Sequence, residues 1–422
     1  FEEALAVAEL AIAQPVGEQT LLHYYKSWCL IRLGKTAEAQ IAIATAEKEP
    51  ADYCFPNALE AIEALQCVVD FAGKAPKALY YLGNLWYDKR RYPTAIAAWE
   101  RSSREDETFP TVWRNLSLAY FNKMNRPDEA VALLEKAFRL DHTDARVLME
   151  LDQLYKRLNR PHIERLCFLE QHIDIVMTRD DLYLEYVTLL NQTGQYREAI
   201  RRIDQRKFHP WEGGEGKVPA QYQLARLELA KELINRKKYD DALALIDECY
   251  IYPTHLGEGK LPGAQENDFN YYKAYILQQQ GRPEEAHSLF VKACSGNSQP
   301  AAAMYYNDQK PDKIFYQGLA YRKLGEEEKA RSRFNQLITY GEEHLFDRFK
   351  MDYFAVSLPD LLIWEDDMDK KNRIHCNYLM ALGHLGLGNR TKAEHFFDIA
   401  ASMDNNHQGV QIHRKLMNTI LS

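Results

Sequence analysis

Four segments in the second half of the sequence concentrate the side chains that could bind a ligand. Two of them are copies of one another, because residues 214–217 and 257–260 both read Gly-Glu-Gly-Lys. Aromatic rings beside carboxylates and amides suit sugars, since a ring stacks on the C–H face of a sugar while the sugar hydroxyls take hydrogen bonds. The candidate ligand-binding residues are His209, Trp211, Glu212, Glu215, Lys217, His255, Glu258, Lys260, Tyr306, Asn307, Asp308, Asp312, Asp360 and Trp364.

The same segments also have a purely structural interpretation. A Gly-Glu-Gly-Lys turn holds a loop in one shape if its Glu and Lys cap helix ends and if Trp211 and Tyr252 fix the loop to the neighbouring helices. The segments are rich in Gly, Pro and aromatic residues, whereas an inert surface insertion tends toward Ser, Gly and charged residues. We therefore expect loops of one defined shape, and the sequence leaves both interpretations open.

Catalytic motifs with a diagnostic spacing are missing from the sequence. A phosphate-binding loop would need Gly in place of Trp211 and Thr254, and Ser or Thr in place of Val218 and Leu261. No GxGxxG or HExxH motif occurs. Hydrolysis of a glycoside needs only two carboxylates roughly 5 to 10 Å apart, a distance that this sequence does not determine. We expect this chain by itself to be non-catalytic and to need no cofactor.

Histidine and cysteine spacing does not predict a metal site. His209 and His255 are offset by three residues when the two loop copies are aligned. The seven cysteines are widely spaced and form no CxxC pair, which is typical of buried thiols in a reducing compartment and predicts a cytoplasmic location. The chain starts at Phe1, already within a helical pattern, so we expect it to be part of a longer protein whose targeting segment, if any, lies upstream.

An alanine followed four residues later by a large apolar residue recurs eight times. The pairs are Ala39/Ile43, Ala95/Trp99, Ala130/Leu134, Ala199/Ile203, Ala242/Ile246, Ala286/Phe290, Ala330/Phe334 and Ala393/Phe397. Five residues before the alanine, six copies carry Gly or Asn and two carry Arg90 or Lys237. The turn residue lets the chain leave one helix in a left-handed conformation, the alanine allows two helices to approach, and the large residue fills the groove between them.

This pattern resembles the tetratricopeptide repeat, a unit of about 34 residues with Leu-Gly in its first helix and Ala in its second. Leu82, Gly83, Gly194 and Ala199 occupy these positions, and the resemblance covers nearly the whole chain. It implies an all-α fold, a right-handed α-α superhelix whose concave face is lined by the first helix of each unit and binds partners in many relatives. First-helix positions that can be placed carry Asn84, Arg114, Asn115 and Gln317, a mixed polar set without a repeated basic pattern.

The spacing of the alanines changes along the chain. The steps are 56, 35 and 69 residues up to Ala199, then 43, 44, 44 and 63. We therefore predict repeats of about 34–35 residues over 1–205, repeats with inserted loops over 206–405, and a C-terminal capping helix over 406–422. The expected insertions are 206–218, 254–266, 295–313 and 342–371. Insertions of similar size in consecutive repeats are expected to lie beside one another on one edge of the solenoid.

The inserted loops carry a second resemblance, which spans residues 196–413. They are similar to the C-terminal repeat region of large bacterial multidomain proteins, in which a galactose-mutarotase-like β-sandwich domain of unknown function precedes the repeats. That resemblance implies a carbohydrate-related role for the longer protein. It also makes the N-terminal domain of the same polypeptide a possible partner of this chain.

Composition narrows the class of partner. The chain has 53 Lys and Arg against 61 Asp and Glu, a net charge of −8, which argues against nucleic acid because phosphate binding depends on clustered basic residues. No apolar run approaches the roughly 18 residues of a membrane helix. We therefore predict a scaffold that binds a protein or a neighbouring domain, and as an alternative a loop edge that binds a carbohydrate and completes a glycoside-processing site with the β-sandwich domain.

Overall fold

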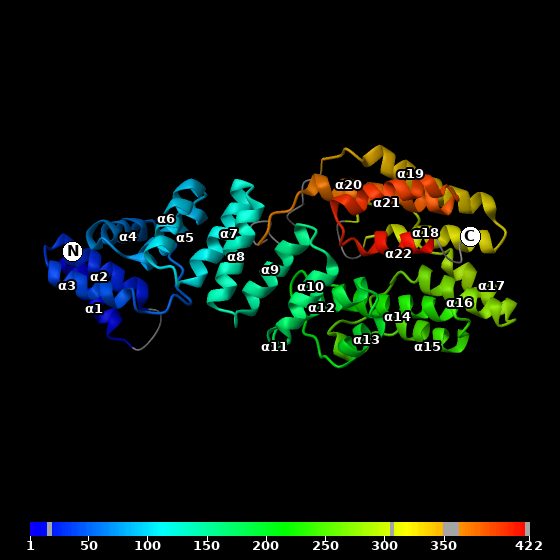
Figure 1. Ribbon diagram of the computed structural model, residues 1–422, viewed down its shortest axis with the longest axis horizontal. Coiled ribbons are helices and arrows are strands. Elements are labelled where there is room, and N and C mark those ends of the chain that lie inside the picture. The colour runs from blue at the N-terminus through cyan, green and yellow to red at the C-terminus, as the bar shows by residue number, and fades with distance from the viewer. Residues whose placement is uncertain (15–18, 304–307, 349–362, 418–422) are drawn as a thin grey trace. The chain divides into compact units, whose positions relative to one another are not determined.

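The computed structural model describes residues 1–14, 19–303, 308–348 and 363–417. Within these ranges the chain folds into 22 α-helices and one 3-10 helix, without a β-strand (Figure 1). The prediction of an all-α helical repeat fold is therefore confirmed. No helix in the described ranges has the length and apolar character needed to cross a membrane.

The chain divides into two compact units, Phe1–Leu154 and Tyr155–Ser422. This division falls earlier than the predicted one at residue 205, which marks a change in repeat length rather than a gap between compact units. The first unit contains three helix hairpins, α2–α3, α5–α6 and α7–α8, together with α1 and α4. Its helices are α1 (Glu2–Ile12), α2 (Thr20–Arg32), α3 (Thr36–Ala46), α4 (Leu59–Ala72), α5 (Pro76–Asp88), α6 (Tyr92–Glu105), α7 (Pro110–Met124) and α8 (Pro127–Leu140). The additional helix α4 accounts for the long first step of 56 residues.

Helix α9 (Ala145–Arg157) begins in the first unit and ends in the second. The second unit continues with five further hairpins, α12–α13, α14–α15, α16–α17, α18–α19 and α20–α21. Its helices are α10 (His162–Gln171), α11 (Ile173–Val176), α12 (Asp180–Gln192), α13 (Tyr196–Asp204), α14 (Lys217–Asn235), α15 (Tyr239–Cys249), η1 (Thr254–Leu256), α16 (Asn267–Gln279), α17 (Pro283–Ala293), α18 (Pro311–Lys323), α19 (Glu327–His344), α20 (Met368–Gly386), α21 (Arg390–Met403) and α22 (Gln408–Leu416).

The recurring alanines pack as the repeat pattern predicts. All eight are at most 2% exposed, and the large residue four positions later is buried in every copy. In the hairpin α5–α6, a Cβ atom on Gly83 would lie 2.2 Å from the Trp99 ring, so only glycine allows this approach of the two helices. The turn residues are all left-handed, including Arg90 at φ 60° and Lys237 at φ 58°, which lack the glycine that favours this conformation.

Consecutive inserted loops lie beside one another. The N–H of Phe208 in the first loop donates to the carbonyl of His255 in the second at 2.8 Å. The Gln265 side chain in the second loop donates to the carbonyl of Asp308 in the third at 3.1 Å. The prediction that insertions of similar size stack along one edge is confirmed for these three loops. Of the fourth predicted insertion, residues 349–362 lie outside the described residues.

Helix α22 does not simply extend the array beyond α21. Its residues or those just before it contact α12, α14, α18 and α20, which are the first helices of four of the five hairpins of the second unit. In Figure 1, α22 (red) lies between α14 and α20. We call the surface that α14, α18 and α20 turn toward α22 the inner face of the second unit. The helix predicted as an end cap therefore occupies the inner face.

Candidate functional site

The first two inserted loops enclose a hollow, which we call the loop pocket. Its volume is about 270 Å³. Five of the predicted ligand-binding residues line it, together with four apolar or small neighbours. The lining residues are His209, Pro210, Trp211, Glu212, Gly214, Glu215, Val218, Leu256 and Glu258. An aromatic ring, three carboxylates and an imidazole thus surround one space.

Trp211 is held by the turn that follows it. Gly214 N–H donates to the Trp211 carbonyl at 3.0 Å, and a Cβ atom at position 214 would lie 2.3 Å from the indole ring. The ring therefore packs directly on the peptide backbone of Gly214 and remains half-buried at the pocket wall. The first glycine of the first Gly-Glu-Gly-Lys copy is required by this close approach.

Glu258 connects the second loop to the start of α14. Its Oε2 accepts a hydrogen bond from the N–H of Gly216 at 2.7 Å, which satisfies a backbone donor at the N-terminal end of that helix. Burial raises the pKa of Glu258, and the nearby Glu215 raises it further, although the hydrogen bond from Gly216 opposes this shift. Glu258 is therefore a helix cap whose carboxyl group has a pKa above its ordinary value.

The two histidines of the loops have separate partners. His209 Nδ1 lies 3.0 Å from Oδ2 of Asp180, which also accepts the His209 N–H at 2.9 Å. Although burial opposes it, these contacts and Arg206 hold the pKa of Asp180 below its usual value. His255 Nε2 instead lies 3.8 Å from Oδ1 of Asp204. Among the described residues no group of three or more His, Cys, Asp or Glu side chains could hold a metal ion.

The two lysines of the repeated motif differ in their surroundings. Lys217 is exposed and forms the first turn of α14. Lys260 Nζ donates to the carbonyl of Tyr250 at 3.1 Å and pairs with Glu266, so it satisfies a carbonyl at the C-terminal end of α15. The contacts of Glu258 and Lys260 are those that the structural interpretation of the motif describes.

Those remaining predicted residues that the structure describes do not line the loop pocket. Asp308 accepts from Gln265 through its carbonyl, and Asp312 lies in the first turn of α18, 3.8 Å from Lys313 Nζ. Trp364 is 1% exposed, and its carbonyl accepts a 3.1 Å hydrogen bond from Arg157. Tyr306, Asn307 and Asp360 lie outside the described residues.

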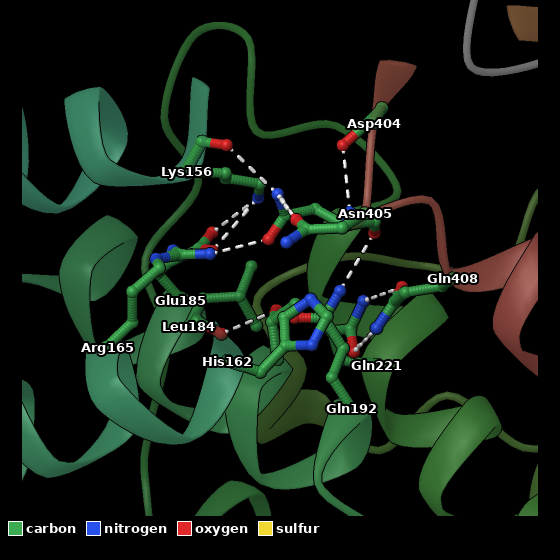
Figure 2. A network of polar contacts seen from close by, with 12 residues as sticks. Lys156, His162, Arg165, Leu184, Glu185, Gln192, Gln221, Asp404, Asn405 and Gln408 are labelled. Carbon is green, nitrogen blue, oxygen red and sulfur yellow. Dashed lines mark hydrogen bonds and ion pairs between the residues drawn. The ribbon is translucent and has the colours of Figure 1, made fainter. Parts of the chain in front are cut away.

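Sequence reasoning missed a polar cluster at the C-terminal end of the second unit, shown in Figure 2. Arg165 is 1% exposed and donates to Asn406 Oδ1 and to Glu185 Oε1, both at 2.7 Å. Lys156 Nζ lies 2.9 Å from the same Glu185 oxygen. Although burial alone would raise it, Lys156 and Arg165 lower the pKa of Glu185 to about 2. No local signal points to this cluster, because its members come from distant parts of the chain.

Backbone groups extend this cluster into what we call the C-terminal clasp, residues 404–407 between α21 and α22. Asn405 donates two hydrogen bonds to Asn159, from its backbone N–H to Oδ1 at 3.1 Å and from its side-chain amide to the carbonyl at 2.7 Å. Asn406 donates to the Lys156 carbonyl at 3.0 Å and accepts from Gln192 through its carbonyl at 2.8 Å. The clasp therefore ties the end of the array to α9, the α9–α10 turn and α12, at the beginning of the second unit.

A second polar cluster, the polar ladder, runs across first helices of the first unit. It consists of Asn84 on α5, Arg114 and Asn115 on α7, and Glu150 on α9. Asn115 donates to Asn84 Oδ1 at 3.0 Å, and Arg114 donates two hydrogen bonds of 2.6 Å to Glu150. Arg146 adds a 2.9 Å hydrogen bond to Glu150 from the solvent side, with its side chain 58% exposed. Three of the four first-helix residues singled out in the sequence thus meet, whereas Gln317 is buried against the carbonyls of Ser295 and Asn297.

Comparison with known proteins identifies the repeat type of one segment. Residues 314–340, which lie in α18 and α19, match the tetratricopeptide repeat family. The chain is also similar to a tetratricopeptide repeat protein from Parabacteroides merdae, at 15% identity over 72% of this chain and 99% of that one, with a TM-score of 0.29. A second similar structure is the TPR domain of P58(IPK), at 13% identity over 90% of this chain and 84% of that one, with a TM-score of 0.28.

At sequence identities this low, structural similarity concerns the fold alone. TM-scores of this size support no conclusion about the shape of the whole chain. The class that the described residues define is an all-α array of helix hairpins with inserted loops in its second unit, in which the hairpin α18–α19 matches the tetratricopeptide repeat family.

Proposed function

We propose that this chain is a non-catalytic scaffold that binds a protein segment along the first helices of its hairpins. The observation that carries this proposal is the polar ladder, because side chains of three successive first helices present amide and guanidinium groups along one line. Such groups bind the peptide backbone and acidic side chains of a partner. Asn84 and Asn115 are half-buried and bonded to each other, and Arg146 is exposed although it contacts Glu150. We take these three residues as the accessible part of this surface.

A peptide library displayed on phage and selected on the immobilised wild-type chain tests the proposal. We expect the selected peptides to bind Arg146→Ala and Asn115→Ala at least ten times more weakly than wild type. Arg139→Ala serves as the matched control, since Arg139 is 67% exposed on α8 and lies outside the polar ladder. Peptides that bind all four proteins equally would contradict the proposed surface.

The loop pocket supports a second candidate function, the binding of a carbohydrate. Trp211 supplies a ring for stacking, and Glu212, Glu215 and Glu258 supply hydrogen-bond acceptors around one space of about 270 Å³. The raised pKa of Glu258 suits a group that donates a proton or a hydrogen bond to a sugar oxygen. In a longer, cytoplasmic bacterial protein with an N-terminal β-sandwich domain, this loop edge would contribute residues to a glycoside-processing site rather than form a complete one.

Calorimetry against a panel of mono- and oligosaccharides tests this second candidate. We expect a sugar that binds wild type to lose at least tenfold in affinity with Trp211→Ala and with Glu258→Gln, which keeps an acceptor for Gly216. Trp113→Ala is the matched control, because Trp113 belongs to α7 and is not among the residues that line the loop pocket. If no sugar of the panel binds the wild-type chain, and all three variants are folded, the result contradicts the carbohydrate proposal and favours a structural role for the loops.

A further inference from the structure

The inner face of the second unit is already occupied by a helix of the same chain. Three residues of α22, spaced three apart on one side of the helix, are buried: Val410, His413 and Leu416. The His413 ring lies 5.6 Å from that of Phe315 and 5.9 Å from those of Tyr316 and Tyr378. Helix α22 therefore sits where the first helices of the hairpins would otherwise face a partner.

The charged residues beneath α22 are paired among the hairpins, without help from α22. Lys313 Nζ lies 2.6 Å from Asp268 Oδ1, and Lys231 pairs with Glu228 on the same helix. All four side chains are 7–10% exposed. Removal of α22 would therefore leave these ion pairs intact, and the inner face would remain a folded surface.

Polar contacts hold the edges of α22. Gln408 and Gln221 exchange side-chain hydrogen bonds of 2.8 and 3.0 Å, and Lys415 Nζ donates to the Tyr196 hydroxyl at 3.2 Å. Arg414 also pairs with Glu394 and Asp398 of α21, and these three side chains are 34–62% exposed. Water replaces contacts of this kind at small net cost.

One buried polar atom of α22 is not satisfied in this position. His413 Nδ1 lies 2.8 Å from the Gly409 carbonyl and 3.1 Å from the Tyr378 hydroxyl, but Nε2 is buried and has no hydrogen-bond partner among the described residues. A buried acceptor or donor without a partner lowers the stability of the contact that buries it. A helix with an apolar side chain in place of His413 would not bury this nitrogen, but the Tyr378 hydroxyl would then need another hydrogen-bond partner.

The short connection to the clasp makes α22 a tethered competitor. The clasp is fixed by Arg165, Asn159 and Lys156, so a rotation near His407 would release α22 while the clasp stays in place. A tethered segment has a high effective concentration, and an external ligand must overcome it. A partner would therefore bind the inner face only if its affinity is high enough to displace the tethered α22.

We propose that α22 is an autoinhibitory occupant of the inner face, and that a helix of a partner protein displaces it. The inference rests on the proposed function, because it assumes that first-helix surfaces bind protein. The partner is an amphipathic helix with apolar residues spaced three apart, at the positions of Val410, His413 and Leu416, and with polar residues such as Gln or Lys at the edges. Such a helix uses the same pockets as α22 without the unsatisfied imidazole nitrogen.

A fluorescein-labelled peptide of residues 408–417, which omits the clasp, is titrated into the full chain by fluorescence anisotropy and tests this proposal. Val410→Ala in the protein weakens its own α22 but leaves the peptide unchanged, so we expect the peptide to bind this variant at least ten times more tightly than wild type. Ile412→Ala is the matched control on the same helix, since Ile412 is not among the three fully buried positions, and we expect it to behave as wild type. Equal affinity for wild type and Val410→Ala would overturn the proposal.

Hydrogen exchange of the wild-type chain provides a second readout that needs no variant. We expect amides of α22 to exchange at least ten times faster than those of α14 and α18, through local opening. Exchange of α22 only together with those helices would also overturn the proposal. If the α22 tests fail while binding to the polar ladder still depends on Arg146, only this inference falls and the proposed scaffold function stands.

Discussion

Arg165 donates a 2.7 Å hydrogen bond from Nη1 to Oδ1 of Asn406, a residue 241 positions further along the chain. The guanidinium is almost fully buried, and its other terminal nitrogen pairs with Glu185. Buried charges persist where hydrogen bonds and opposite charges satisfy them. The pair therefore makes the integrity of the second unit depend on a contact between its two ends.

Asn406→Ala should destabilise the second unit by about 2 to 3 kcal/mol, because it removes an acceptor of the buried Arg165 guanidinium. Urea unfolding followed by circular dichroism measures the change. Asn235→Ala, at the exposed C-terminal end of α14, should change the stability by less than about 0.5 kcal/mol. Equal effects of the two substitutions would show that the clasp contributes nothing to stability.

Ala242→Leu should destabilise the chain by about 1 to 3 kcal/mol, since Ala242 is 0% exposed at the contact between α14 and α15 and a larger side chain overpacks it. Ala244→Leu makes the same chemical change two residues along the same helix, at an exposed position, and should be nearly neutral. Thermal unfolding of both variants measures the difference. Normal stability of Ala242→Leu would contradict the assignment of the repeat.

Gly214→Ala should disrupt the loop pocket, because the added Cβ atom would lie 2.3 Å from the Trp211 ring. We expect a destabilisation of about 1 to 3 kcal/mol from the forced displacement and a shift of the Trp211 fluorescence. In the second copy of the motif, Gly259→Ala is the control, since its Cβ atom would meet nothing within 4 Å. Unchanged fluorescence in Gly214→Ala would show that the indole does not pack on this turn in solution.

Stability should decrease on mild acidification because of His413. Burial lowers the pKa of this ring to about 4, assisted by Lys231 and Lys313 and opposed by Asp312 and by the hydrogen bond to Gly409. Between about pH 6.5, the ordinary value in an unfolded chain, and pH 4, the unfolded state binds a proton that the native state excludes. The stability that the neutral, buried His413 contributes above about pH 6.5 is therefore lost as the pH falls from about 6.5 to about 4.

Urea midpoints at pH 7.5 and pH 4.5 measure this effect. We expect His413→Gln to be less stable than wild type at pH 7.5 but to lose less stability between the two pH values. An identical loss in both proteins would show that His413 is not buried in its neutral form.

Local patterns predicted much of the fold and part of the pocket. The alanine spacing identified the hairpins, and the two Gly-Glu-Gly-Lys copies predicted adjacent loops, because neighbouring repeats place equivalent residues side by side. His209, Trp211 and Glu258 were singled out on this basis and line one space. Contacts between neighbouring repeats are accessible to such reasoning, since they recur at the repeat spacing.

Contacts that depend on the curvature of the array were not predictable. The clasp joins Asn159 to Asn405, and α22 turns back onto α14 and α18, which no periodic pattern encodes. Left-handed turns at Arg90 and Lys237 were missed as well, because neighbouring helices impose that conformation on residues that do not favour it. The burial of Trp364, which the sequence offered as a ligand-binding residue, was not predictable for a similar reason. Its carbonyl accepts a hydrogen bond from Arg157, which lies near the beginning of the second unit.

Hydrogen exchange of the intact chain, with and without a saturating peptide selected on wild type, tests the scaffold proposal most directly. Protection at amides of α5, α7 and α9 is the predicted result, because these helices carry the polar ladder. Arg146→Ala should abolish that protection, whereas Arg139→Ala should keep it. Protection confined to the loops at 208–217 and 251–260, with the first helices unchanged, would contradict the proposed binding surface.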